Sequence, residues 1–234
     1  METLQHYSAA DLRSQLGILS PSYDDLEKKF PEWNYWLDRI NDLAPLGQLI
    51  HLGDSISHKN NSTEFQFPLL SLVFGNKQPT APTLLLVGGV HGLERIGSQV
   101  VLALLKSFGE LLLWDQQLIK SLQEFRIIFL PFVNPIGILK KTRSNPNGVD
   151  LMRNAPINAD EDPTFLVGGH HISSRLPWYR GEALQPESEA LIQLAKRFLY
   201  PSQHVISIDF HSGFGIKDRL WFPYAKTKKP FPHL

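Results

Sequence analysis

The sequence contains no cysteine. Its absence excludes disulfide bonds, thiolate nucleophiles and cysteine-ligated metal sites, so any metal ion must be held by histidine and carboxylate side chains. An excess of charge is also missing, because 23 Lys and Arg residues balance 23 Asp and Glu residues. No long-range field therefore draws the chain to nucleic acid or to an anionic membrane surface, and we expect neither partner.

Long hydrophobic runs are absent too. No run approaches the roughly 20 residues needed to span a bilayer, and the first 15 residues lack the apolar segment of a secretory signal. We therefore expect a cytoplasmic location. No repeat or linker divides the 234 residues, which are enough for one sizeable core. Residues 1–234 are predicted to form a single domain. The sequence pattern does not indicate how many copies of the chain associate.

Apolar periodicity predicts an α/β fold. Three continuous apolar runs, at residues 82–89, 125–132 and 204–210, are typical of strands buried on both faces. Residues 94–114 carry apolar residues all round, which predicts a packed helix, and residues 187–198 have helical spacing. Their alternation predicts a mixed, largely parallel central sheet with helices on both faces, incomplete at the C-terminus.

Other segments are predicted less regularly. An amphipathic helix with a break near Pro31 is predicted from the spacing of Leu26, Phe30, Trp33, Leu37, Ile40 and Leu43. Residues 48–52 and 67–74 are predicted as short strands, with a polar turn at 54–62. Residues 140–180 are rich in Asn, Pro, Gly and charge, which indicates a long surface loop.

Polar residues follow two of the buried strands. His91 and Glu94 lie just beyond the first run, where a three-residue separation around one turn lets both side chains converge on one point. His211 ends the run at 204–210 and precedes a Gly turn. An isolated strand-end histidine more often caps neighbouring backbone. Two histidines and one glutamate, however, form the ligand set of catalytic zinc sites, so we predict that they hold one zinc ion.

The third motif is an arginine-bearing loop at residues 141–154. Arg143 and Arg153 flank an Asn-Gly turn. A guanidinium offers a fixed, permanently charged fork, which suits carboxylate recognition and oxyanion stabilisation. The alternative is a solvated basic loop.

Together, these motifs resemble the zinc carboxypeptidase family, and the resemblance runs from Tyr23 to Tyr224. It includes residues 178–181, the Pro-Glu-Ser-Glu helix start that follows them, and residues 221–224. The resemblance implies the zinc ligands His91, Glu94 and His211. It implies that Arg143 polarises the scissile carbonyl, with Lys140 as the alternative from a longer-loop branch, that Arg153 grips the terminal carboxylate of the substrate, and that Ser212 contacts substrate.

Two departures from the family pattern affect the function. Met152 stands where the family has asparagine, and methionine donates no hydrogen bond to a carboxylate. The general-base glutamate of the family is expected beyond residue 234, so we expect this chain to be a C-terminally truncated member.

Two further candidates remain open. Asp209 shares a strand face with His211 and is interpreted either as a partner of its ring or as a buried capping acid. His170 and His171 are adjacent in the chain, so we read them as loop residues rather than ligands, with a substrate contact as the alternative.

The sequence is therefore consistent with three functions. The first is hydrolysis of a peptide or peptide-like amide, with release of the C-terminal residue. The second is zinc-dependent deacylation of a small N-acyl amino acid, favoured by Met152. The third is a non-catalytic zinc-binding fragment, favoured by the missing general base.

Overall fold

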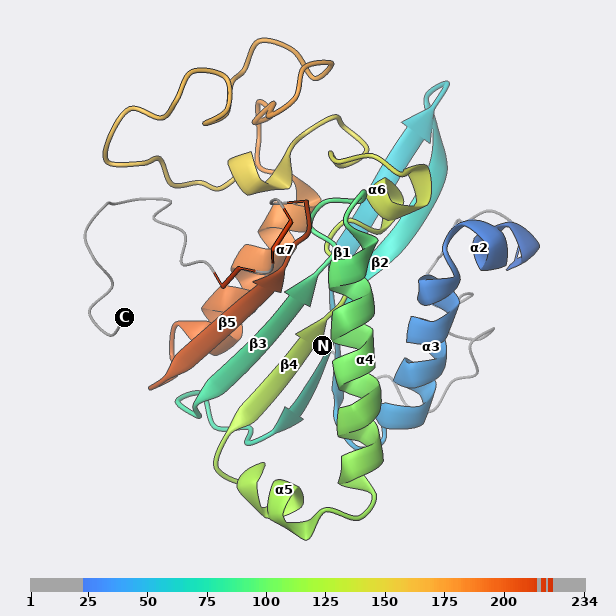
Figure 1. Ribbon diagram of the computed structural model, residues 1–234, viewed down its shortest axis with the longest axis vertical. Coiled ribbons are helices and arrows are strands. Elements are labelled where there is room, and N and C mark those ends of the chain that lie inside the picture. Colours follow the sequence, from blue (N-terminus) through green and yellow to red (C-terminus); the bar gives the residue numbers. More distant parts are fainter. Residues whose placement is uncertain (1–22, 214–215, 218, 221–234) are drawn as a thin grey trace.

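A five-stranded mixed sheet forms the centre of the molecule (Figure 1). The computed structural model describes residues 23–213, 216–217 and 219–220. The strands, in the order β1-β2-β4-β3-β5 across the sheet, are β1 (Gln48–Lys59), β2 (Ser62–Gly75), β4 (Arg126–Leu130), β3 (Thr83–Gly88) and β5 (Val205–Phe210). Over these described residues, no helix combines the length and the apolar character needed to cross a membrane.

The sheet is half parallel. Strand β3 pairs in parallel with β4 and with β5, whereas β2 is antiparallel to both β1 and β4. The carboxyl ends of β3, β4 and β5 therefore lie at the same end of the sheet. Polar residues that follow these strands are brought together there.

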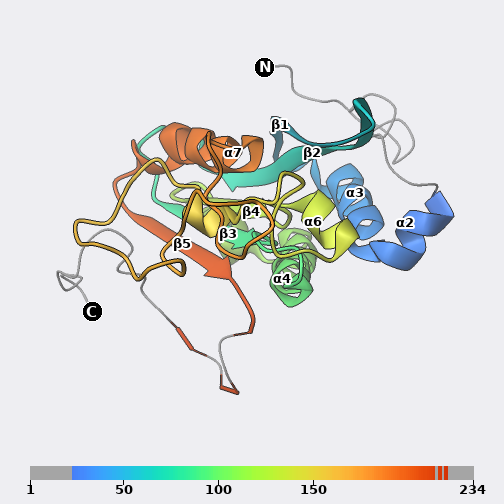
Figure 2. The same cartoon turned by 90° about the horizontal axis from the view of Figure 1, so that it is seen from above.

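Helices cover both faces of the sheet (Figure 2). On one face lie α3 (Pro31–Leu43) and α4 (Arg95–Leu112), and on the other lies α7 (Pro186–Leu194), which continues into the short η2 (Ala195–Leu199). Successive residues of β4 alternate between the two layers, because Ile127 and Phe129 join the α3/α4 core while Ile128 and Leu130 join the α7 core. This alternation explains why the central strands read as continuous apolar runs.

The first helical segment has the break predicted at Pro31. The helix α2 (Tyr23–Lys29) ends just before that residue, and α3 begins at it. Proline is tolerated at the first position of a helix, where its missing N–H would have no intrahelical partner. All six apolar residues of the predicted stripe are buried.

Strands β1 and β2 are longer than predicted. Residues 54–62 do not form a separate polar turn, because β1 continues to Lys59 and forms a hairpin with β2 around Asn60 and Asn61. Both asparagines have positive φ, as a two-residue hairpin turn requires. The inward positions carry Ser55 and Ser57, whose polar side chains conceal the alternating pattern of the strand.

Strand β5 differs from its prediction in burial. The apolar run at residues 204–210 forms the strand, but Ile206 is 63% exposed and Val205 is 41% exposed. The cause is its place in the sheet: β5 lies at an edge, where a described strand covers only one side.

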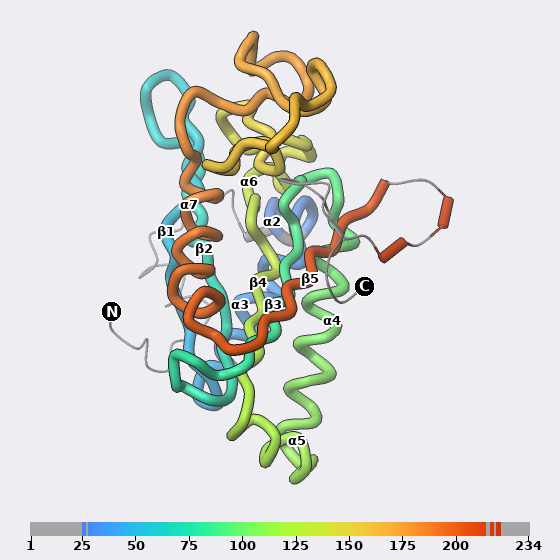
Figure 3. Tube along the Cα trace, turned by 90° about the vertical axis from the view of Figure 1, so that its left-hand side faces the viewer, coloured from blue at the N-terminus to red at the C-terminus, as the bar shows by residue number. Residues whose placement is uncertain are grey.

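The long loop predicted at residues 140–180 lies beyond the carboxyl ends of the parallel strands (Figures 1 and 3). It follows α6 (Pro135–Lys140) and contains a single 3-10 turn, η1 (Leu151–Arg153). The predicted motif at residues 221–224 lies outside the described residues.

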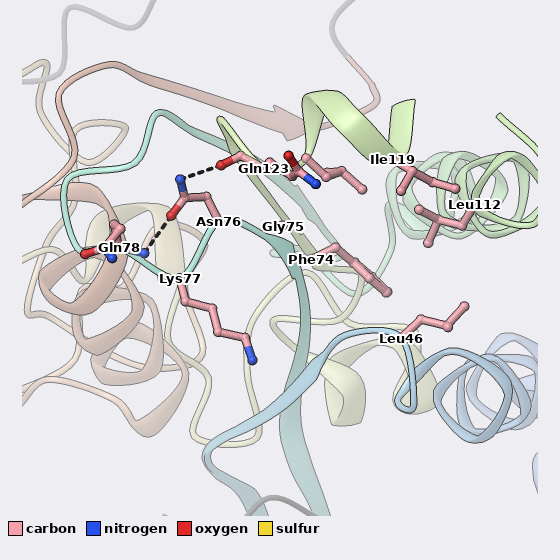
Figure 4. A pocket seen from close by; sticks show the side chains of 10 residues that line it. Leu46, Phe74, Gly75, Asn76, Lys77, Gln78, Leu112, Ile119 and Gln123 are labelled. Atoms are coloured by element: carbon pink, nitrogen blue, oxygen red, sulfur yellow. Dashed lines mark hydrogen bonds between the residues drawn. The ribbon is translucent and has the colours of Figure 1, made fainter. Parts of the chain in front are cut away.

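A cleft of about 720 Å³ opens at the other end of the sheet (Figure 4). Leu46, Leu112 and Ile119 line its apolar part, beside α5 (Gln116–Ser121). Gly75, another lining residue, pairs with Arg126 at the amino end of β4. The cleft is therefore separate from the residues that follow the carboxyl ends of the strands.

Candidate metal centre

The turn after β3 supplies the first two candidate ligands. His91 lies three residues beyond the strand, and Glu94 is the residue that precedes the first turn of α4. The amide of Glu94 donates to the carbonyl of His91 (3.0 Å), which closes the turn between them. Both side chains are buried, His91 being 2% exposed and Glu94 8%.

The neighbouring strand supplies the third. His211 directly follows β5, and its Nδ1 lies 3.0 Å from Oε2 of Glu94. Nδ1 of His91 lies 2.9 Å from the other oxygen, Oε1. One ligand atom from each residue lies within 4.8 Å of the others. The three side chains predicted to converge from distant parts of the sequence do so.

A carboxylate holds the outer nitrogen of each imidazole. Nε2 of His91 lies 3.2 Å from Oδ1 of Asp150, and Nε2 of His211 lies 2.7 Å from Oδ2 of Asp209. In a neutral imidazole these outer carboxylates favour the N–H on Nε2 and leave the lone pair of Nδ1, which faces Glu94, for a metal ion, as carboxylates behind metal-binding histidines do. Asp209 is thus a partner of the ring and is not a buried capping acid.

The sequence pattern did not predict that Asp150 belongs to the site. It belongs to the arginine-bearing loop, 59 residues from His91, and its side chain is 2% exposed. The apolar neighbours Val149 and Leu151, both buried, are the one local signal that it points inward. That signal does not identify the histidine that it contacts.

The charges of the cluster stabilise one another. Burial alone would lower the pKa of His211, but the hydrogen bonds to Asp209 and Glu94 raise it to about 9. Burial alone would raise the pKa of Glu94, but hydrogen bonds from His211, His91 and the Ser212 amide hold it far below its usual range. Without a metal ion the protonated imidazoles are therefore favoured, and a divalent cation bound between these residues would take the place of the protons that face Glu94.

Arg143 lies at the edge of this cluster. Its Nε donates to Oδ2 of Asp150 (3.0 Å), and its Nη1 lies 3.5 Å from Oε1 of Glu94. About a third of its side chain is exposed. The guanidinium is therefore both fixed by a buried carboxylate and accessible from outside.

The remaining predicted residues occupy different places. The backbone amide of Ser212 donates to Oε2 of Glu94 (2.8 Å). Arg153 lies outside the cluster, where its Nε donates to the carbonyl of Val167 (2.9 Å). Lys140 does not replace Arg143, because its Nζ binds Glu64 in the β1–β2 hairpin (2.7 Å).

The two loop histidines are not brought to the candidate ligands. His170 is buried, and its ring contacts the carbonyl of Pro177 (2.7 Å) and the amide of Ile172 (3.1 Å). It therefore stabilises the loop itself. His171 is exposed.

The fold and this cluster define an α/β protein with a candidate site for one metal ion at the carboxyl ends of its parallel strands. The described donor set, two imidazole nitrogens and one carboxylate, fits zinc and leaves a coordination position for water or substrate. The family model described as zinc carboxypeptidase matches residues 49–233. The chain belongs to the zinc carboxypeptidase family.

Individual relatives agree with this assignment. The chain is 30% identical over 169 residues to the human carboxypeptidase N catalytic chain, which covers 65% of this chain and 35% of the relative. It is 26% identical over 234 residues to human carboxypeptidase D, covering 91% of this chain and 15% of the relative. The chain thus spans about a third or less of the length of these curated relatives.

Solved structures share the fold. The carboxypeptidase A of Helicoverpa armigera superposes with a TM-score of 0.57 at 18% identity, covering 80% of this chain and 46% of that one. A putative carboxypeptidase A from Shewanella denitrificans gives a TM-score of 0.54 at 18% identity, covering 79% and 40%. The mixed α/β architecture is therefore that of carboxypeptidases.

Proposed function

We propose that the protein is a zinc-dependent hydrolase that cleaves peptide or peptide-like amide bonds and releases the C-terminal residue. The observation that carries the proposal is the convergence of His91, Glu94 and His211 within 4.8 Å, with a carboxylate behind each imidazole. Zinc, when bound, supplies a Lewis acid that activates water and polarises a carbonyl.

The residues of the chain have distinct tasks in this proposal. His91, Glu94 and His211 hold the ion, and Asp150 and Asp209 keep the two rings turned toward it. Arg143 stabilises negative charge that develops on the carbonyl oxygen, because it is fixed by Asp150 yet one-third exposed. The general-base glutamate that the family resemblance implies is not identified among the residues of this chain, which spans about a third or less of its curated relatives, so hydrolysis is proposed for the whole protein.

Zinc analysis of the purified full-length protein tests the metal centre. We expect one zinc ion per chain, lost on dialysis against a chelator and restored by added zinc. His91→Ala is expected to abolish stoichiometric zinc, whereas His58→Ala, which removes an exposed histidine of β1, leaves it unchanged. A wild-type protein without zinc would contradict the proposal.

A second candidate is deacylation of a small N-acyl amino acid. Met152 favours it, because the side chain is 39% exposed beside Arg153 and offers no hydrogen bond to a terminal carboxylate. Comparing kcat/KM for dipeptides and for N-acyl amino acids separates the two. Faster hydrolysis of dipeptides supports the peptidase, and the reverse supports the deacylase. Zinc binding with turnover of neither substrate indicates a non-catalytic protein.

A further inference from the structure

Both ends of one short loop contact the metal centre. Arg143 at its start and Asp150 at its end hydrogen-bond to each other, and they reach Glu94 and His91 respectively. The loop belongs to no helix or strand between these residues. Side-chain contacts, together with two backbone hydrogen bonds between Asn145 and residues Gly148 and Val149, therefore fix its shape and decide where Arg143 and Asp150 lie.

Asn145 fixes the shape of the loop. Its Oδ1 accepts from the backbone amides of Asn147 (3.1 Å) and Val149 (3.0 Å). The backbone N–H of Asn145 donates to the backbone carbonyl of Val149 (2.9 Å). The side chain is buried, and its Nδ2 donates away from the loop to Oε1 of Gln185 and Oε2 of Glu187, each at 3.0 Å. Every polar atom of this side chain is used.

Glu187 fixes the loop to the body of the protein. It lies in the first turn of α7, is 1% exposed, and its second oxygen accepts from the hydroxyl of Ser55 in β1 (2.6 Å). Across the residues that the structure describes, no lysine, arginine or histidine forms an ion pair with it. Two neutral donors, the Ser55 hydroxyl and the Asn145 amide, hydrogen-bond to its two oxygens at the amino-terminal end of α7.

A buried carboxylate without a cation is costly, so simple packing does not account for this residue. Its two oxygens join three parts of the structure: strand β1, helix α7 and the 143–150 loop. We propose that Glu187 is a positioning residue that, through Asn145, holds Arg143 and Asp150 at the metal centre. This inference rests on the proposed function, because it assumes that the centre binds zinc.

Exchanging the amide of Asn145 and the carboxylate of Glu187, one position at a time and then together, tests the inference. Asn145→Asp places a second carboxylate against Glu187, and the repulsion is expected to displace the loop and to withdraw Asp150 from His91. Zinc affinity, measured by competition with a chelator, should then fall by about tenfold or more, as when the outer partner of a metal-binding histidine is lost. The kcat for substrate hydrolysis should fall as well, because Arg143 moves with the same loop.

Adding Glu187→Gln to Asn145→Asp should restore part of the zinc affinity, because the contact with residue 187 returns while Oε1 of Gln185 still faces the introduced carboxylate. The introduced amide donates to the introduced carboxylate, so the hydrogen bond returns with donor and acceptor exchanged. Glu187→Gln alone should have a small effect, since its amide oxygen still accepts from Asn145. Glu189→Gln, on the exposed side of the same helix, is the matched control and should change nothing.

The outcomes separate this inference from the proposed function. Wild-type protein that binds no zinc removes both. Wild-type protein that binds zinc, with Asn145→Asp of equal affinity or with no rescue by the second substitution, overturns the positioning role alone. If Asn145→Asp does not fold, Glu187→Ala removes the hydrogen bond from Nδ2 of Asn145 (3.0 Å) while the contacts of Asn145 within the loop remain, and it should lower zinc affinity; unchanged affinity in that variant overturns the role.

Discussion

Each imidazole of the metal centre has two different neighbours, and this division decides what the centre can bind. The inner nitrogens of His91 and His211 face Glu94, and the outer nitrogens face Asp150 and Asp209. The two outer contacts are not equivalent, because the side chain of Asp150 is 2% exposed and that of Asp209 is 33% exposed. Water screens the second contact more than the first.

Asp209→Asn tests the outer contact of His211. The substitution keeps the size of the side chain but removes the charge that stabilises the ring N–H. We expect zinc affinity to fall about tenfold, the lower end of the usual range, because the contact is partly exposed. Competition with a chelator measures it, and Asp160→Asn in the exposed loop is the control. An affinity equal to that of the control would show that Asp209 does not orient the ring.

Arg143→Ala tests the proposed stabilisation of the carbonyl oxygen. We expect kcat to fall by about 10²–10³-fold, the cost of removing one oxyanion donor, while the zinc content stays at that of the wild type. Steady-state kinetics with a peptide substrate, together with metal analysis, measure both. A loss of zinc in place of kcat would mean that Arg143 maintains the structure of the centre and does not act on substrate.

The sequence predicted part of this site and not the rest. His91, Glu94 and His211 were predictable, because each follows an apolar run that identifies a strand end. Asp150 was not, since a contact across 59 residues leaves no local pattern. The Lys140–Glu64 ion pair was unpredictable for the same reason, and it removes Lys140 from the alternatives for Arg143.

Helix α4 connects the two halves of the metal centre at the element scale. It begins directly after Glu94, and Gly97 in its first turn lies against the backbone of Phe210, which precedes His211. A Cβ at Gly97 would lie 2.0 Å from the carbonyl oxygen of Phe210. The lack of a side chain at Gly97 therefore sets how closely α4 approaches β5.

Gly97→Ala is expected to destabilise the protein by about 1–3 kcal/mol, because backbone must shift to admit the methyl group. Zinc affinity should fall as well, since the shift moves His211. Gly109→Ala on the same helix is the control: the atoms nearest to its Cβ would belong to the flexible side chain of Leu43, at 3.0 Å, and alanine favours the helix. Urea unfolding measures both variants, and equal stabilities would contradict the prediction.

Glu32 joins α3 to the start of α4. It accepts from Nε of Arg95 (3.2 Å) and from Nε2 of Gln99 (2.8 Å). Burial alone would raise the pKa of Glu32, but these hydrogen bonds outweigh it and lower the pKa from 4.5. The folded state therefore binds this proton less readily than the unfolded state, and the stabilisation is present above pH 4.5 and lost as the pH falls below it.

Glu32→Gln should accordingly lower the free energy of unfolding by about 1 kcal/mol at neutral pH, the net value of such hydrogen bonds. The difference from the wild type should shrink as the pH falls below 4.5. Urea titrations at several pH values measure it. A difference that is constant with pH would exclude the ionised carboxylate as its source.

Helices and strands were predicted best where a single pattern of apolar residues dominates the segment. The α3 stripe and the runs of β3 and β4 follow a single pattern, and the structure confirms them. The prediction for β1 was too short, because Ser55 and Ser57 occupy inward positions that an apolar residue usually takes. The exposure of β5 depends on the order of strands in the sheet, which the run at 204–210 does not contain.

At the scale of the whole molecule, β5 is an edge strand that exposes the apolar residues Val205 and Ile206. Within the described part of the chain, β5 pairs on one side only, with β3. Unpaired N–H and C=O groups beside exposed Val205 and Ile206 form a template for another strand. The 234-residue chain is therefore expected to associate with itself through this edge.

Ile206→Lys should reduce that association, because a charge on an edge strand opposes pairing. Light scattering over a range of protein concentrations measures it. Ile172→Lys is the matched control, since Ile172 is 64% exposed but lies in the loop rather than on the edge strand. An equal effect of both variants would assign the association to surface hydrophobicity in general.

The pairing of β3 with β5 gives the metal centre a further property. Gly88 lies opposite Phe210, so the two histidines lie three residues and one residue beyond a matched pair in the ladder. A slip of β5 by one residue would displace His211 by about 3.3 Å and turn it to the opposite face. An ion that requires both imidazoles would thus select a single alignment of the two strands, and zinc affinity would report whether the edge strand is correctly aligned.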